Sequence, residues 1–135
     1  MSGYMLDTNA VSDLMYDPIG PVGQRLALLG PVDVCVSLIA VAELRFGTCK
    51  SGSPRIAMQL ERVLSGLAVK AWDAPADRLY GEVRAELQRS GRLIGANDLL
   101  IAAHALALDC ILITDNEREF SRVPGLRVEN WLREP

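Results

Sequence analysis

Aromatic residues, histidine and cysteine are all scarce in this sequence of 135 residues. Because aromatic residues make up only 5% of the chain, we expect a core of Leu, Val, Ile and Ala. The three cysteines, Cys35, Cys49 and Cys110, form no CxxC pair and no Cys/His ligand spacing, so the sequence offers no thiolate metal site. Cys35 and Cys110 lie in apolar runs and are expected to be buried. Free thiols fit the reducing cytoplasm.

Long hydrophobic runs are absent as well. The start, MSGYMLDTNA, has no basic region followed by a long apolar stretch, so we expect no signal peptide. The longest apolar stretch, Leu99 to Leu108, is interrupted by His104 and is too short to span a bilayer. We therefore expect no association with a membrane.

An excess of positive charge is also missing. The chain has 17 acidic and 14 basic residues, for a net charge of −3. This balance argues mildly against a protein whose main task is to neutralise phosphates, because such domains are usually basic overall. It is compatible with an enzyme that gathers its acids in one pocket and keeps its bases on the rim.

The composition that remains is that of an ordinary globular protein. Half of the residues are hydrophobic and 23% are charged, which is unlike the composition of disordered chains. A chain of this length is too short for two comfortable cores. We therefore expect one domain spanning residues 1–135.

Short apolar strands alternate with helical segments along the whole chain. We predict strands at 4–6, 32–37, 68–72, 110–114 and 127–129, and helices at 11–15, 21–29, 38–48, 55–64, 75–89, 97–108 and 117–120. In the third helix, Ile39, Ala42, Leu44 and Phe46 are candidate core positions. Continuous apolar strands separated by helices indicate a parallel sheet covered on both faces. The predicted fold class is α/β: a three-layer α/β/α sandwich with a central, mainly parallel sheet.

Acidic residues follow the strands of this predicted sheet. Asp7 ends the first strand, Asp115 follows the strand at 110–114, and Glu43 comes shortly after the strand that ends at Ser37. Asp98 begins a helix directly after a loop that contains glycine. Ligands of open α/β sheets bind at the carboxyl ends of the strands, so we expect these acids at one edge of the sheet.

Such a group of carboxylates needs a cation, because like charges repel. Oxygen ligands without cysteine or paired histidines suit a hard ion, Mg²⁺ or Mn²⁺. A divalent ion that also contacts a phosphate is the usual setting for metal-assisted cleavage of a phosphodiester.

Each of these residues also has a purely structural interpretation. An Asp after a strand often caps the next helix, and Thr8 and Asn9 are better candidates for caps than for metal ligands. Asp98 could be an acid that is favoured in a first helical turn. His104, on an apolar helix, is better explained as a structural residue. For Glu43 a functional role is favoured, because a carboxylate in the apolar segment AVAEL needs a partner.

Four segments together resemble the VapC-type toxins of the PIN-domain family: YMLDTNAVSDL, VSLIAVAELRFG, IGANDLLIAAHAL and LITDNEREFSRVPGLRVENW. They match the four sequence blocks of that family in order and spacing, over nearly the whole chain. The resemblance implies a PIN-like fold and an endoribonuclease that depends on Mg²⁺ or Mn²⁺. It also implies a homodimer and a cognate VapB antitoxin whose tail blocks the active site. The helical hairpin at 38–65 is where the resemblance places that antitoxin.

The resemblance implies that Asp7, Glu43 and Asp98 form the core acidic triad. Thr114 and the next two residues match the fourth block, T-x-D/N, but here the acid is Asp115 and the second residue is Asn116. Which of these two serves the fourth position therefore stays open. We predict that four residues are catalytic, Asp7, Glu43, Asp98 and Asp115, with Asp7 and Asp98 as metal ligands. The residues predicted to support these ligands or to contact RNA are Thr8, Ser37, Thr114, Asn116 and Arg92, with Arg118, Arg45 and Lys50 as further candidates for phosphate contacts.

The predicted reaction is attack of a metal-activated water on an RNA phosphodiester, which leaves 5′-phosphate and 3′-hydroxyl ends. A phosphatase of the haloacid dehalogenase type is disfavoured because it needs a second Asp two residues after the first, where this chain has Asn9. A receiver domain is disfavoured because no Lys lies near the strand at 110–114. The intact triad argues against a third possibility, a degenerate PIN fold that only binds a partner.

Overall fold

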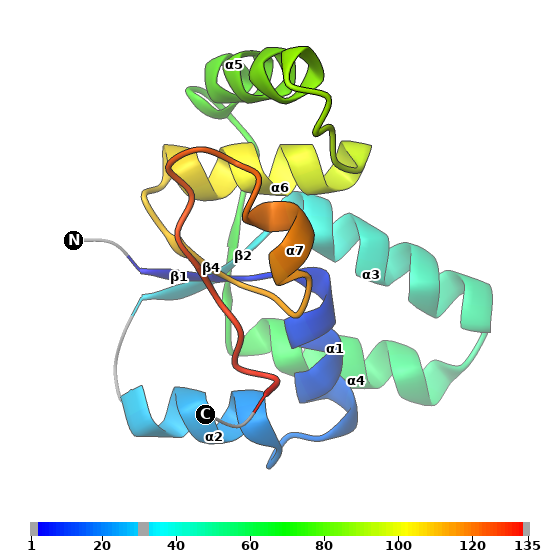
Figure 1. The fold of residues 1–135 in the computed structure, drawn as a ribbon. Coiled ribbons are helices and arrows are strands. Elements are labelled where there is room, and N and C mark those ends of the chain that lie inside the picture. The colour runs from blue at the N-terminus through cyan, green and yellow to red at the C-terminus, as the bar shows by residue number, and fades with distance from the viewer. Residues whose placement is uncertain (1–2, 30–32, 134–135) are drawn as a thin grey trace.

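A parallel β-sheet forms the centre of the protein in a computed structural model, which describes residues 3–29 and 33–133 (Figure 1). In these residues the sheet has the order β3-β2-β1-β4-β5, and every neighbouring pair of strands is parallel. The strands are β1 (Tyr4–Leu6), β2 (Val34–Ser37), β3 (Ala68–Lys70), β4 (Ile111–Ile113) and β5 (Val128–Glu129). The N-terminal strand β1 is central, because Leu6 lies opposite Val36 on one side and Ile113 on the other.

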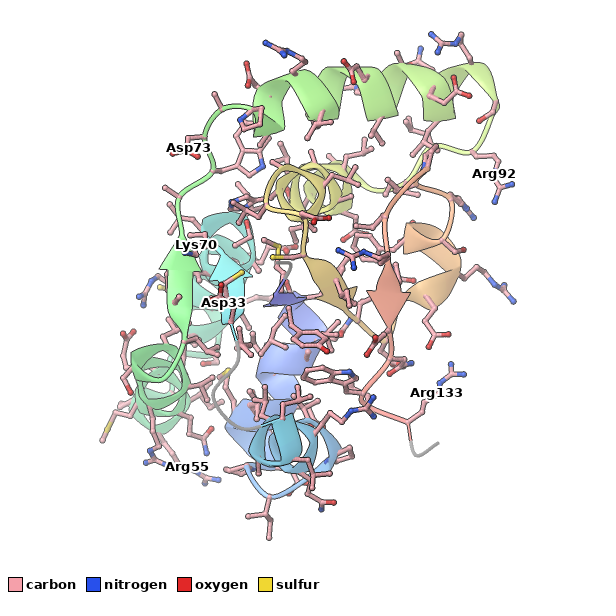
Figure 2. The ribbon with its side chains drawn as sticks, turned by 90° about the vertical axis from the view of Figure 1, so that its left-hand side faces the viewer. Asp33, Arg55, Lys70, Asp73, Arg92 and Arg133 are labelled. Atoms are coloured by element: carbon pink, nitrogen blue, oxygen red, sulfur yellow. The ribbon has the colours of Figure 1, made fainter. Side chains whose placement is uncertain are left out.

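Helices cover both faces of the sheet. They are α1 (Thr8–Tyr16), α2 (Pro21–Leu29), α3 (Leu38–Ser51), α4 (Pro54–Ser65), α5 (Ala76–Arg89), α6 (Ala96–Ala107) and α7 (Glu117–Phe120). Figure 1 shows α5 and α6 on one side of the sheet and α1, α2 and α4 on the other. Figure 2, which is turned by 90° about the vertical axis, shows the same layers. The predicted three-layer α/β/α sandwich is confirmed.

The burial of α6 explains its unusual sequence. Six of its twelve residues are buried, including Ile101, Ala102 and Ala105, because the helix lies between the sheet and α5. A helix that is apolar nearly all round is expected in such a position. Met5, Leu6, Leu112 and Ile113 of the central strands are also fully buried, and each such aliphatic side chain contributes roughly 1.5–3 kcal/mol by leaving water. The core is therefore aliphatic, as the composition predicts.

Several element boundaries differ from the prediction. Helix α1 begins at Thr8 rather than at residue 11, because the Asp7 carboxylate accepts a hydrogen bond from the Thr8 N–H at 2.8 Å and caps the helix. Helix α3 continues to Ser51, where Gly52 ends it with a φ of 66°. Strand β3 ends at Lys70, two residues earlier than predicted. Residue 32, the predicted start of the second strand, lies outside the described residues.

The prediction that Ala42 and Phe46 belong to the core is wrong. Both side chains are exposed, and 69% of Phe46 is accessible to solvent. Helix α3 extends beyond the edge of the sheet, so its outer half has no sheet to pack against (Figure 1). Leu44 is buried and Ile39 is partly buried, and Cys35 and Cys110 are buried free thiols, as predicted. In the described part of the chain, no helix is both long and apolar enough to cross a membrane.

Candidate active site

The strand order brings distant acidic segments to one edge of the sheet. Asp7 follows β1, Ser37 ends β2 and Thr114 follows β4, and these three strands are neighbours. Because the strands are parallel, their carboxyl ends lie together. Helices α1, α3 and α6 begin at this edge (Figure 1). The candidate site therefore lies where the sequence predicts it.

Asp7 is the most deeply buried acid of the site, with 4% of its surface exposed. One oxygen, Oδ1, caps α1, and the other, Oδ2, accepts a hydrogen bond from Thr114 Oγ1 at 2.7 Å. Burial raises the pKa of Asp7 above its ordinary value, the hydrogen bonds from Thr114 and Thr8 oppose this shift, and the charge of Glu43 adds to it. Asp7 is thus both the cap and an acid whose charge is unfavourable without a cation.

Asn9 joins the ends of β1 and β4. Its Nδ2 lies 3.2 Å from Thr114 Oγ1, and its Oδ1 accepts a hydrogen bond from the Asp115 N–H at 3.0 Å. The sequence favours Asn9 as a helix cap, whereas in the structure Asp7 caps α1. Asn9 instead fixes the position of Thr114, and thereby the hydrogen bond that Thr114 donates to Asp7.

Glu43 connects three helices. Its Oε1 accepts a hydrogen bond from Thr8 Oγ1 at 2.9 Å, and its Oε2 accepts one from Asn97 Nδ2 at 3.2 Å. The carboxylate therefore has the partners that its apolar surroundings require. Arg45 is not one of them, because it pairs with Glu61 of α4 at 2.5 Å.

Asp98, in the first turn of α6, has a pKa raised to about 7. Burial is the largest cause, followed by a hydrogen bond with Glu119 and by the negative charges of Asp7, Glu119 and Glu43. Hydrogen bonds also connect these acids: Thr8 contacts both Asp7 and Glu43, and Asn97, which precedes Asp98, contacts Glu43. The structure thus brings together the three acids of the predicted triad.

Glu119 lies beside Asp98, and the sequence analysis did not single it out. Its pKa is lowered, mainly by the Asn116 amide, whose Nδ2 lies 2.5 Å from Glu119 Oε2. Asp98, Arg122 and the backbone of Gly95 also lower it. Glu119 lies on α7, three residues after Asn116, the residue before that helix. Residues at this spacing lie on the same side of a helix, so the sequence contained a signal that could have identified Glu119.

Asp115 is not brought to the other acids. Its side chain is half exposed, accepts a hydrogen bond from Asn130 Nδ2 at 3.0 Å and lies 3.9 Å from Arg133 Nε. Asn116, in contrast, contacts residues of the site. Its N–H donates to Thr114 Oγ1 at 3.0 Å, and its side-chain amide contacts Glu119. In this geometry Asn116 and Glu119, unlike Asp115, are linked by hydrogen bonds to the group of acids.

The predicted supporting residues divide into two groups. Thr8 and Thr114 contact the acids directly, whereas Ser37 does not. Ser37 is fully buried, accepts the Ile39 N–H at 3.1 Å as the cap of α3, and lies 2.8 Å from Nδ1 of His104. Burial lowers the pKa of His104 and so favours its neutral imidazole, which shares a hydrogen bond with the Ser37 hydroxyl.

The basic residues predicted to contact phosphates are spread over the surface. Arg92 is exposed in the loop before α6 (Figure 2), and Lys50 lies near the Phe46 ring in the last turn of α3. Arg118 is exposed on α7, beside the site. Lys50 shares α3 with Glu43 and Arg118 shares α7 with Glu119, whereas Arg92 lies in a loop.

The chemistry of these acids fits a divalent cation. Asp7, Asp98, Glu43 and Glu119 offer only oxygen donors, and burial together with mutual repulsion raises the pKa values of Asp7 and Asp98. Within residues 3–29 and 33–133, however, no three His, Cys, Asp or Glu side chains converge closely enough to hold an ion. A bound ion would therefore have to draw the carboxylates closer together.

The fold and this acidic edge define a class of protein. The model of the PIN domain matches residues 4–126, so the chain belongs to the PIN-domain family. PIN-domain ribonucleases generally depend on divalent metal ions. The chain is 41% identical over 134 residues to ribonuclease VapC2 of Haemophilus influenzae strain Rd, which covers 98% of this chain and 100% of the relative. It is 39% identical over 132 residues to the tRNA(fMet)-specific endonuclease VapC of Shigella flexneri. This match covers 97% of this chain and 99% of the relative.

Solved structures agree with these relatives. The fold resembles the toxin–antitoxin complex VapBC2 of Rickettsia felis bound to a promoter DNA fragment, with a TM-score of 0.87 and 38% identity over 95% of this chain and 98% of that one. It also resembles the DNA-bound VapBC of Salmonella typhimurium, with a TM-score of 0.85 and 35% identity. That match covers 97% of this chain and 99% of the other. Within the PIN-domain family, the chain belongs with the VapC ribonucleases, which separates it from the phosphatase and receiver alternatives.

Proposed function

We propose that this ribonuclease is the toxin of a toxin–antitoxin pair, that it cleaves RNA internally with the help of Mg²⁺ or Mn²⁺, and that it acts as a single domain in the cytoplasm. The observation that carries the proposal is the group of four carboxylates at the carboxyl edge of the sheet, with the pKa of Asp98 raised to about 7. Such a group is unfavourable for the folded protein by itself, because the ionised acids repel one another. A bound divalent cation would remove this cost.

In this proposal Asp7 and Asp98 hold the cation, and Glu119 completes the set of oxygen donors. A divalent ion there would activate water and offset the charge that develops on the phosphate. Thr114 orients Asp7 through its hydrogen bond of 2.7 Å. Groups that fix metal ligands in this way typically contribute about 10- to 100-fold to metal affinity.

Glu43 is proposed to orient the attacking water. Thr8 and Asn97 hold its two oxygens on opposite sides, so the carboxylate has a fixed direction toward the space between α1 and α6. Because water and not the RNA 2′-hydroxyl attacks, the products carry 5′-phosphate and 3′-hydroxyl ends. Single-stranded loops are the expected substrates, since only unstacked nucleotides can enter such an edge.

A VapB-type antitoxin is the proposed inhibitor, and the α3–α4 hairpin is its proposed docking surface. Phe46 of α3 and Met58 of α4 are 69% and 65% exposed, which is unusual for large apolar side chains. A groove of about 250 Å³ lies between α1, α3 and α4 and is lined by Thr8, Glu43 and Ile56, among others. A tail placed in this groove would reach the acids. We also propose a homodimer, as is typical of the family.

The proposal is tested with the purified protein and a structured RNA. We expect cleavage with Mg²⁺ or Mn²⁺, none with excess chelator, and products that a 5′-phosphate-dependent exonuclease degrades. Asp7→Asn should abolish cleavage while the protein stays folded, as judged by circular dichroism. Products with 2′,3′-cyclic phosphate ends, or full activity of the Asp7→Asn variant at saturating Mg²⁺, would contradict the mechanism.

A further inference from the structure

A polar pocket lies beside α7 and is lined in part by Asn116, which contacts Glu119 of the acidic site. Its volume is about 470 Å³, and it lies between α7 and the segment that follows β5. Figure 2 places Arg133 below α7 and Arg92 above it, on the same side of the molecule. The residues that line the pocket are Asp115, Asn116, Glu117, Arg118, Ser121 and Arg133.

The pocket shares one residue with the active site. Asn116 lines the pocket, while its N–H donates to Thr114 Oγ1 and its side chain contacts Glu119. Thr114 in turn donates a hydrogen bond to Asp7. The pocket is therefore connected through Asn116 and Thr114 to Asp7, a metal ligand of the proposed mechanism. A nucleotide that flanks the cleaved bond would reach it.

The chemistry of the lining suits a neutral polar ligand better than a phosphate. Asp115 and Glu117 balance the charges of Arg118 and Arg133, so the pocket has no net positive charge to attract an anion. Asn116 adds an amide, and Ser121 adds a hydroxyl that donates to the Arg118 carbonyl. Donors and acceptors side by side match the edge of a nucleobase, and a guanidinium plane can also stack on a base.

The arginine at the mouth of the pocket is available for such a contact. Arg133 Nε lies 3.9 Å from Asp115 Oδ1, which is a long separation for an ion pair, and 71% of the Arg133 side chain is exposed. The same Asp115 oxygen accepts a closer hydrogen bond from Asn130, at 3.0 Å. The guanidinium is therefore not held tightly by its acidic neighbour.

We infer that this pocket receives the base of a nucleotide adjacent to the cleaved bond and so gives the enzyme a base preference at that position. The inference rests on the proposed function, because it assumes that RNA crosses the acidic edge. It explains why the acid at position 115 faces away from the other acids: its carboxylate helps to form the pocket instead. It also assigns to Arg118 a contact with a base rather than with a phosphate.

The first test measures base preference. A pool of RNA with randomised nucleotides in a single-stranded loop is cleaved briefly, and the 5′-phosphate ends are sequenced. We expect the wild-type protein to prefer one base at one flanking position. Arg133→Gln and Arg118→Gln should each reduce that preference about tenfold. The control is Arg78→Gln, an exposed arginine at the start of α5, which should keep the wild-type profile.

The second test separates a base contact from a phosphate contact. Binding of the preferred RNA is measured in Ca²⁺, without cleavage, over a range of salt concentrations. Loss of a base contact leaves the slope of log affinity against log salt unchanged, whereas loss of a phosphate contact lowers it by about 1. An unchanged slope is expected for Arg133→Gln. A reduced slope, or a base preference equal to that of the wild type, would overturn the inference.

A third readout keeps this inference distinct from the proposed function. The ratio of kcat/KM for the preferred RNA to that for a small phosphodiester, which cannot reach the pocket, should fall in both arginine variants. If the wild-type protein cleaves neither substrate with Mn²⁺, the proposed function fails. If it cleaves both and the variants change only inhibition by the antitoxin, the pocket binds the antitoxin and the inference is wrong.

Discussion

Asp98 and Asp77 occupy similar positions, each in the first turn of a helix, yet their surroundings differ. Asp77 is exposed, whereas Asp98 is partly buried and faces three other acids. We predict that Asp98→Asn abolishes RNA cleavage and raises the melting temperature at pH 8 in the absence of metal. Asp77→Asn should keep activity and lose about 0.3–1 kcal/mol of stability, because an acid is favourable at a helix N-terminus. Scanning calorimetry and an RNA cleavage assay measure both effects, and a destabilised Asp98→Asn variant would contradict the repulsion.

The pH dependence of stability follows from the raised pKa of Asp98, about 7 against an ordinary 3.8. Between these values the folded protein binds a proton that the unfolded chain has released, so stability falls as the pH rises from about 4 to 7. We predict a lower melting temperature at pH 8 than at pH 5 without metal, and a smaller difference for Asp98→Asn. Mn²⁺ should restore stability at pH 8 in the wild type by binding the folded state. No response to Mn²⁺ would count against a metal site.

Glu119 and Asp115 are the two acidic candidates for the fourth position of the site. Because Glu119 contacts Asp98 and Asp115 does not, we predict that Glu119→Gln weakens Mn²⁺ binding by about tenfold or more, as loss of a ligand or its support does. Asp115→Asn should change the Mn²⁺ affinity much less. Titration calorimetry measures both affinities. The reverse order would favour Asp115, one of the two residues that the sequence leaves open for the fourth position.

At the scale of elements, the N-cap of α3 joins two helices of the site. Ser37 caps α3 and also contacts His104 of α6, and both side chains are buried. We predict that Ser37→Ala lowers the free energy of unfolding by about 2–3 kcal/mol, because the change removes a cap and leaves His104 without its partner. Ser53→Ala is the matched control, since Ser53 caps α4 through the Ile56 N–H at 3.3 Å but is only partly buried. It should cost only about 1 kcal/mol in urea denaturation. Equal losses would show that the contact with His104 contributes little.

The positions of most elements could be predicted from the sequence, because apolar period and turn residues are local signals. The helix at 21–29 and the turn at 117–120 have the predicted bounds. The start of α1 was missed because one carboxylate, Asp7, serves both as cap and as site residue. The exposure of Phe46 was missed because periodicity shows which residues are apolar, not how far the sheet extends beneath a helix.

At the scale of the whole molecule, the exposed apolar residues of the α3–α4 hairpin need a partner. We predict that Phe46→Ser and Met58→Ser weaken binding of the cognate antitoxin by about tenfold or more, as apolar residues at the centre of an interface do. Neither change should lower the melting temperature, because both side chains are mostly exposed. Leu28→Ser is the control: Leu28 is 84% exposed near the end of α2, which is not part of the hairpin. Weaker binding of the Leu28→Ser variant alone would move the interface to α2.

The sequence by itself determined the α/β class, the succession of strands and helices, and the positions of Asp7, Glu43 and Asp98 next to strand ends or helix starts. These features depend on residues that are close together in the chain. The tertiary structure decided which strand ends became neighbours: with β1 between β2 and β4, Thr114 reaches Asp7 across 107 positions of sequence. It also decided that Glu119 faces the acids and Asp115 faces Arg133, because the direction of a side chain depends on the path of the backbone after the strand.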